Sequence, residues 1–244
     1  MAVTMRSPAL LARTLHKWLA LTLGVQLVLW TLSGFYMVIV DLDLIHGDPL
    51  VRNLRLPLAL DHASVPVGEV AQRYPEVTQV VIRAMPSFAN PVYEVTALGR
   101  RLLVDSRTGE QISPLSEGRV RELARHYYAG RGELRSVGLL EHEHPLEIQT
   151  HALPLWRADF DDWLETSLYL HPDTGALMTR RHRLWRWFDF FWMLHIMDYE
   201  TRDDMNNALL RATTVLGAIA ILSGGWLLFF SFSSRRRRAV RATG

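Results

Sequence analysis

The sequence predicts an α+β protein in which two transmembrane helices flank an extracytoplasmic domain of two α-β-β repeats with a small antiparallel sheet. Residues 18–40 and 213–232 carry no charge, and each run reaches the roughly 20 apolar residues that a helix needs to cross a bilayer. All 25 acidic residues lie between Asp41 and Asp204. Alternating apolar residues and turn motifs within that acidic region predict strands.

Basic residues at both ends of the chain predict its orientation in the membrane. Arg6, Arg13 and Lys17 precede the first apolar run without any acid, and five arginines follow the second. Because short basic flanks stay inside, we expect a multi-pass protein of the bacterial inner membrane with both termini cytoplasmic. The first run is too long for a signal peptide, and no A-x-A-like cleavage site follows it.

The expected divisions of the chain follow from these boundaries. We expect a cytoplasmic N-terminus at 1–17, a first transmembrane helix at 18–40 and a periplasmic domain at 41–184. An aromatic interfacial helix with a polar break follows at 185–205, then a second transmembrane helix at 206–232 and a basic cytoplasmic tail at 233–244. Asn206 is the expected N-cap of the last helix, and Ala220 with Gly224 forms a small-residue pair for helix packing.

Two segments of the central region resemble each other. Residues 91–112 and 154–178 each contain two apolar runs joined by a polar bend, and each ends in a tight turn, D-S-R-T-G or H-P-D-T-G. They predict two β-hairpins. Helices are expected at 67–74 and 116–128, the second capped by Ser116 and stopped by Gly130. The order helix, strand, strand then occurs twice, as in a duplicated unit.

Three parts of the sequence together resemble one family. The motif Y-x-V-x…V-D-x-x-T-G-E is similar to the PepSY domain, a small α-β-β unit found outside bacterial membranes. L-H-K-W-L-A-L at the start of the first apolar run resembles PepSY-associated transmembrane proteins, as does W-R-W-F-D-F-F-W-M-L-H-I-M-D-Y before the last one. The resemblance implies a PepSY-like periplasmic domain. It also implies kinship with siderophore-reductase-like membrane proteins, which look like haem-bearing electron conduits.

Three histidines are candidate cofactor ligands. The resemblance favours His16 and His195 as axial ligands of haem b; the alternative is that both residues only anchor helices at the membrane surface. The first apolar run measures roughly 35 Å as a helix, so these two histidines cannot share one haem. His46 lies on the same side as His195 and could complete a bis-His site. A haem on His16 would need a second copy, so we expect a homodimer or a larger membrane complex.

A His/Glu-rich tract is a candidate metal site. Glu141-His142-Glu143-His144 is followed by Glu147 and His151. In a strand, His142 and His144 would share one face, and imidazole with carboxylate suits zinc, iron or copper. The alternative is a solvated loop before Pro145. Arginines 180, 181, 183 and 186, which precede the aromatic helix, could bind lipid phosphates or haem propionates.

The sequence therefore favours one function over two others. We expect a haem b electron-transfer component that supports reduction of an extracytoplasmic substrate such as a ferric chelate; if the chain is an enzyme, it is a membrane oxidoreductase. The absence of cysteine excludes covalently attached c-type haem. The alternatives are a PepSY binding or regulatory module and an accessory subunit of a larger complex. The lipid bilayer is the expected partner, and nucleic acid is not.

Overall fold

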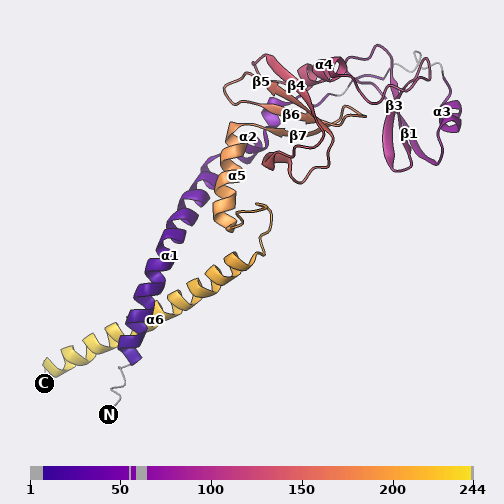
Figure 1. The fold of residues 1–244 in the computed structure, drawn as a ribbon. Helices are drawn as coiled ribbons and strands as arrows, with labels where there is room; N and C mark the ends of the chain where they lie inside the picture. Colours follow the sequence, from indigo (N-terminus) through magenta and orange to yellow (C-terminus); the bar gives the residue numbers. More distant parts are fainter. Residues whose placement is uncertain (1–7, 55, 59–64, 243–244) are drawn as a thin grey trace. The chain divides into compact units, whose positions relative to one another are not determined.

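The chain folds into two compact units, each of which is described by itself. A computed structural model describes residues 8–54, 56–58 and 65–242, with the side chains of the last helix described up to residue 229. One unit contains the chain up to Val40 together with the chain from Phe188 onward, and the other is Asp41–Trp187 (Figure 1). Of the predicted cytoplasmic N-terminus (1–17) and basic tail (233–244), residues 1–7 and 243–244 lie outside the described residues.

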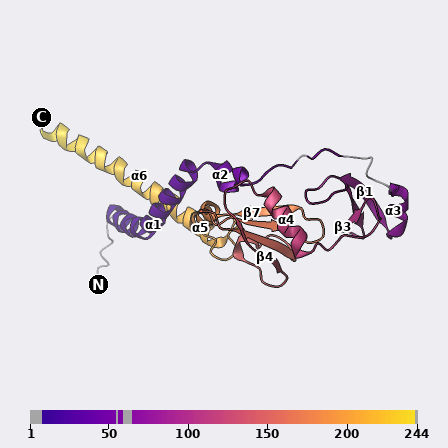
Figure 2. The same cartoon turned by 90° about the horizontal axis from the view of Figure 1, so that it is seen from above.

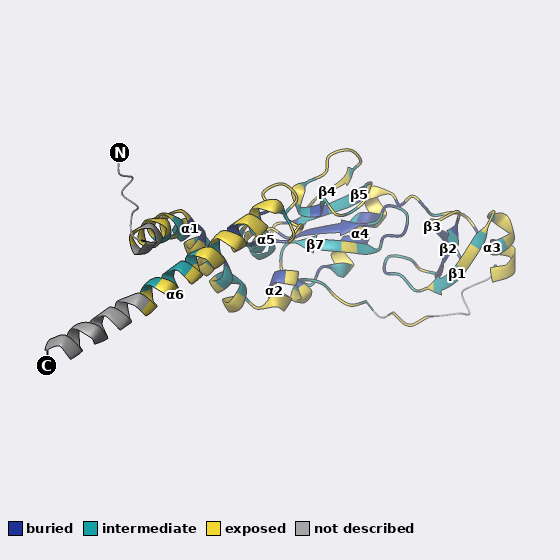
Figure 3. Cartoon of the chain, turned by 90° about the horizontal axis from the view of Figure 1, so that it is seen from below, coloured by how far each residue is buried: buried dark blue, intermediate teal, exposed yellow. Residues whose placement is uncertain are grey.

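Two long helices dominate the first unit. Helix α1 is Pro8–Ile39 and helix α6 is Ala208–Ala242. Both are long and apolar enough to cross a membrane, over Arg13–Ile39 and Ala208–Phe229. The two predicted apolar helices are thus confirmed, although each helix extends past its charge-free run. Most of their described apolar side chains are exposed (Figure 3), so protein packing does not cover them.

A compact turn connects α5 (Arg183–Ile196) to α6. The Asp198 carboxylate accepts hydrogen bonds from four backbone N–H groups and the Thr201 hydroxyl, which hold the pKa of Asp198 well below its usual range. The expected N-cap, Asn206, is wrong by one residue. Asn207 Oδ1 accepts from the Leu210 backbone N–H at 2.8 Å, which is the bond that caps α6.

The segment after α1 packs against the second sheet. Asp41 caps the short helix α2 (Leu42–His46) through the backbone N–H of Asp43, and the 3-10 helix η1 (Asp48–Leu50) follows. Gly47 adopts a φ of 73°, and a Cβ there would lie 3.0 Å from the His182 ring, so glycine is required at this position. His182 is fully buried and its Nε2–H donates to the Ile45 carbonyl.

The first half of the domain is a helix followed by three antiparallel strands. Helix α3 is Val67–Arg73, and strands β1 (Val77–Arg83), β2 (Val92–Ala97) and β3 (Arg100–Asp105) form a sheet in that order. The predicted hairpin at 91–112 is confirmed as β2–β3, with Val92 opposite Asp105. Gly99, with a φ of 72°, makes the tight connection that this pairing requires.

The second half is a helix followed by four antiparallel strands. Helix α4 is Glu117–Tyr127, and strands β4 (Leu134–Leu140), β5 (Leu155–Phe160), β6 (Ser167–Leu170) and β7 (Leu177–Arg181) form the second sheet in sequence order. A 3-10 helix, η3 (Leu146–Ile148), lies between β4 and β5. The predicted hairpin at 154–178 is confirmed as β5–β6.

The structure differs from the sequence predictions in three respects. It contains two antiparallel sheets instead of one, and it adds β1, β4 and β7, three strands at sheet edges whose partly exposed residues lack a clear alternation. Ser116 occupies the N-cap position of α4 without a side-chain hydrogen bond. The helix ends before Gly130, because Tyr128 leaves helical geometry to form a bridge with Val51.

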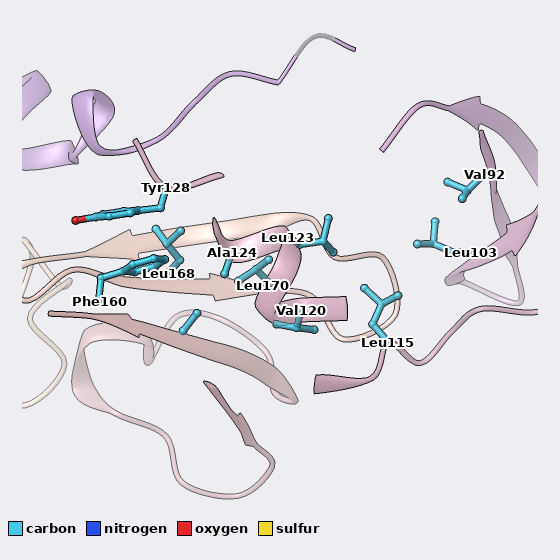
Figure 4. Close-up of a cluster of buried hydrophobic side chains, with 11 residues drawn as sticks. Val92, Leu103, Leu115, Val120, Leu123, Ala124, Tyr128, Phe160, Leu168 and Leu170 are labelled. Atoms are coloured by element: carbon cyan, nitrogen blue, oxygen red, sulfur yellow. The ribbon is translucent and has the colours of Figure 1, made fainter. Parts of the chain in front are cut away.

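One hydrophobic core joins the two sheets. Val92 and Leu103 come from the first sheet, Leu123 from α4, and Leu168 and Leu170 from the second sheet (Figure 4). All five are completely buried. Burial of an aliphatic side chain contributes about 1.5–3 kcal/mol, so this cluster supplies a large part of the domain's stability.

Candidate functional site

A stripe of polar side chains follows one face of α1. His16, Gln26, Trp30 and Ser33 are spaced by three, four or multiples of such steps along an otherwise apolar helix. Gln26 and Ser33 are buried, with Ser33 fully inaccessible. Polar side chains that remain in an apolar helix need partners, and the structure supplies them from α5 and α6.

His195 meets this stripe at Ser33. The Nδ1 atom of His195 lies 2.9 Å from Ser33 Oγ, and Ser33 Oγ donates its single proton to the Leu29 carbonyl at 2.7 Å. This arrangement fits the tautomer in which Nδ1 carries the proton and donates to Ser33. Within the described part of the chain, Nε2 of His195 has no hydrogen-bond partner, so its lone pair is available to a ligand.

The C-terminal end of α5 is held by side-chain donors. The carbonyls of its last three residues accept from Gln26 Nε2 at 3.2 Å, Trp30 Nε1 at 2.8 Å and Asn207 Nδ2 at 2.8 Å. These bonds satisfy carbonyl groups that a helix end leaves free. They also fix the backbone that carries His195, so the imidazole projects from a rigid element.

Aromatic rings surround the α1–α5 contact. The ring centroids of Tyr36 and Phe191 are 4.8 Å apart, and Phe188 stacks on Trp192 at 6.1 Å. Cofactors with flat, apolar faces bind in surroundings of this kind.

His16 has the same arrangement at the contact between α1 and α6. Its Nδ1 lies 3.1 Å from the Ala220 carbonyl and 3.0 Å from Ser223 Oγ. A carbonyl only accepts, so Nδ1 carries the proton here as well. Gly224 lies directly beneath the ring, and a Cβ there would come within 2.9 Å of His16 Cε1. The predicted small-residue pair Ala220 and Gly224 therefore accommodates an imidazole from α1.

The two imidazoles are far apart. His195 contacts α1 at Ser33. At a rise of 1.5 Å per residue, Ser33 lies about 25 Å from His16 along the axis of α1. Each histidine therefore belongs to its own site. His46, the third predicted ligand, lies in the Asp41–Trp187 unit, where it lines a small cavity of about 230 Å³ with Met178 and Trp185. Its pairing with His195 stays a prediction.

The His/Glu-rich tract forms a loop after β4. His142 is exposed, and His144 Nε2–H donates to the His151 carbonyl at 2.7 Å. Glu147 is engaged by Arg186. Burial and then the positive charges of Arg181 and His144 lower the pKa of His151. Over residues 8–54, 56–58 and 65–242, no three histidine or carboxylate side chains gather as metal ligands, so the metal site of His142, His144 and His151 stays a prediction.

The arginines at the end of β7 and the start of α5 are engaged within the domain. Arg180 pairs with Asp48, and Arg183 pairs with Glu165. Arg181 lies with its guanidinium over the Trp185 ring at 3.9 Å, and Arg186 Nε donates to Glu147 Oε2 at 2.7 Å. These arginines hold β7 and α5 against neighbouring elements, a role that their sequence pattern did not indicate.

The histidine partners were not identified from sequence. Ser33, Gln26 and Trp30 read as ordinary residues of a membrane span, although their helical spacing from His16 is a signal that sequence inspection can find. Ser223 and the Ala220 carbonyl have no such signal, because their role depends on how α6 meets α1.

Comparison with known proteins adds no family. No family model matches the chain, and neither a curated protein nor a solved structure resembles it. The fold and the candidate site define a class in structural terms: a mixed α+β chain with two helices of membrane-spanning length and two histidines held by neighbouring helices.

Proposed function

We propose that this chain is a two-pass protein of the bacterial inner membrane that binds haem b and transfers electrons in support of reduction outside the cytoplasm. The substrate class is a ferric chelate. The proposal extends the PepSY-like resemblance of the sequence. It rests on one structural observation. The Nδ1 atoms of His16 and His195 each lie within hydrogen-bond distance of an oxygen on a neighbouring helix, and neither Nε2 has a partner among the described residues.

That observation matches how proteins prepare a histidine ligand. A metal-ligating histidine usually donates its other ring N–H to a carbonyl or similar acceptor, which fixes the tautomer and raises the basicity of the ligating nitrogen. The Ala220 carbonyl does this for His16, and Ser33 Oγ does it for His195. These contacts set the orientation of both imidazoles.

The residues present fit one axial ligand at each site. The aromatic side chains near His195 suit the faces of a porphyrin, and the donor is an imidazole, the common nitrogen ligand of haem iron. A haem bound there would supply reversible one-electron chemistry. Ser33 and Ala220 would hold the Nδ1 proton in place during the redox cycle, and the bonds of Gln26 and Trp30 to the end of α5 would limit movement of the ligand. At the His16 site, a second ligand would have to come from another copy or another subunit.

Membrane insertion is supported by exposed apolar surface. Val25, Phe35 and Val38 of α1 are 69%, 65% and 85% exposed, and Ile221 and Leu222 of α6 are each more than 70% exposed. In the described chain, no protein element covers this surface of either helix. Lipid would cover it. The basic flanks then place both termini in the cytoplasm and the Asp41–Trp187 unit in the periplasm.

A reduced-minus-oxidised visible spectrum tests the haem proposal. The full chain is expressed with haem precursor, purified in detergent and reduced with dithionite; we expect a b-type α band. His16→Ala and His195→Ala should each lower or shift that band, and His126→Ala, an exposed histidine on α4, should not. Colourless protein at full haem supply would refute the proposal, and unchanged spectra in both variants would refute the ligand assignment.

A second candidate is a non-enzymatic binding or regulatory module on a membrane anchor, or an accessory subunit. One observation favours it. The Asp41–Trp187 unit has its own core and a cavity of about 540 Å³, within the range typical of small-molecule sites. The same spectrum separates the candidates, because a binding module needs no haem.

A further inference from the structure

A cavity of about 540 Å³ lies within the Asp41–Trp187 unit where several parts of the chain meet. Most of its walls come from the extended segment after η1, the end of β1 and the loop after it, the C-terminal end of α4, and the turn into β7; Asp48 of η1, Glu94 of β2 and Arg180 of β7 complete them. Figure 2 shows the two sheets of this unit next to each other along the chain, and residues from both of them line the cavity. The cavity therefore depends on both halves of the domain and on the segment that follows α1.

The cavity has an apolar part. Met85 from the loop after β1, Tyr127 from α4 and Leu177 from β7 line it together with Val51 and Leu54 of the extended segment. Burial of a ligand's apolar surface against such side chains contributes roughly 25 cal/mol per Å² before the costs of association. A ligand with an apolar body is therefore favoured over a fully polar one.

Positive charge predominates in the polar part. Arg52, Arg83 and Arg180 line the cavity, against two acids, Asp48 and Glu94. Both acids are already paired: Asp48 with Arg180, and Glu94 with Arg83 Nε at 3.0 Å. A further arginine, Arg101, approaches Glu94 at 3.6 Å from β3. The carboxylates are thus more than neutralised by the domain's own arginines.

Arg52 is the one lining cation among the described residues that has no carboxylate partner. Its guanidinium reaches only the His126 carbonyl, at 3.4 Å, while its backbone N–H donates to the Tyr127 carbonyl at 2.7 Å. The backbone bond fixes the residue at the cavity wall, and the loosely held guanidinium remains available. An arginine in this state suits a carboxylate or a phosphate.

We propose that this cavity binds an amphipathic organic anion, with its carboxylate or phosphate on Arg52 and its apolar body against Met85, Tyr127 and Leu177. Neither histidine of the haem proposal belongs to this unit, so the two proposals stand separately. The anion site supplies the second candidate function with a ligand class.

Three probes with one apolar body and different head groups test the charge preference. The full chain in lipid nanodiscs is titrated by calorimetry with 4-phenylbutyrate, 4-phenylbutanol and 4-phenylbutylamine, and the signal of empty nanodiscs is subtracted. We expect the anion to bind most tightly and the amine least. Phenyl phosphate, compared with benzoate, then shows whether phosphate or carboxylate is the preferred head group.

Three variants assign the site. Arg52→Gln should weaken binding of 4-phenylbutyrate by about tenfold, the order expected for a lost charge-assisted contact, and leave 4-phenylbutanol unchanged. Ala176→Trp, which fills the cavity from the turn before β7, should weaken both. Arg125→Gln, an exposed charge change on α4, should weaken neither. Equal affinity for all three head groups, no binding at millimolar concentration, or equal effects of Arg52→Gln and Arg125→Gln would each overturn the proposal.

Discussion

Glu147 is the acceptor at the centre of a buried polar network, and its removal gives a quantitative test of the fold. The fully buried Tyr169 donates its hydroxyl to Glu147 Oε1 at 2.5 Å, and Arg186 donates to both carboxylate oxygens, at 2.7 and 3.2 Å. The network ties η3, β6 and the start of α5 together. Glu147→Ala leaves the hydroxyl of Tyr169 without an acceptor and Arg186 without its counter-charge.

The expected loss is about 3 kcal/mol. Removing one partner of a buried ion pair costs about 3–5 kcal/mol. The lower end applies because the Arg186 side chain is 31% exposed and keeps its bonds to the Glu165 carbonyl and Ser167 Oγ. For a unit of this size the loss corresponds to a fall in melting temperature of roughly 6–12 °C. Near-UV circular dichroism of the full chain in detergent would measure it.

The pH dependence of this effect has a defined sign. Burial alone would raise the pKa of Glu147, but hydrogen bonds from Arg186 and Tyr169, with the positive charges of Arg186 and Arg157, lower it below its ordinary value of 4.5. Because the folded-state pKa is the lower one, the contribution is complete above pH 4.5 and is lost as the pH falls through the folded-state value. The difference between the parent chain and Glu147→Ala should therefore shrink on acidification.

Glu143→Ala is the matched control, since Glu143 is exposed on the same loop. We expect it to change stability by less than about 0.5 kcal/mol. If Glu147→Ala and Glu143→Ala had equal effects, or if the cost of Glu147→Ala did not change with pH, the assignment of Glu147 as a buried, paired acceptor would be wrong.

Three further predictions follow from single contacts. Burial lowers the pKa of His182 below 6.5, and the positive charges of Arg186 and Arg180 add to this, although the hydrogen bond to the Ile45 carbonyl opposes it. The contribution of His182 to stability is therefore complete above pH 6.5 and is lost as the pH falls below it. Thermal unfolding of His182→Gln should show a weaker loss of stability between about pH 7.5 and 5.5 than that of the parent chain. Gly224→Val should destabilise the helical unit by about 1–3 kcal/mol, because the new side chain would meet the imidazole of His16. Gly225→Val places its side chain in open space and should be near neutral. The free energies of unfolding of the two variants in detergent test this difference. Asn207→Ala should cost about 1 kcal/mol through loss of the α6 cap, and equal costs for Asn206→Ala and Asn207→Ala would contradict the assigned N-cap.

Local sequence patterns were sufficient to predict the two apolar helices and the two hairpins. The two apolar helices follow from charge-free runs, and β2–β3 and β5–β6 follow from alternation bounded by turn residues. These features depend on neighbours in sequence, so they can be inferred without knowledge of the rest of the chain. The edge strands β1, β4 and β7 were missed because an edge strand is partly exposed and needs only one partner, so its sequence carries a weak pattern.

The candidate sites, like the fold, were predicted only in part from the sequence. The sequence by itself determined that His16 and His195 lie beside apolar helices and that any haem would be non-covalent, because there is no cysteine. Only the tertiary structure decided that Ser33 Oγ and the Ala220 carbonyl lie within hydrogen-bond distance of their Nδ1 atoms, and that Arg186 and Tyr169 engage Glu147. The physical reason is that residue type and periodicity are local properties, whereas a hydrogen bond between residues far apart in sequence depends on how their helices and strands pack.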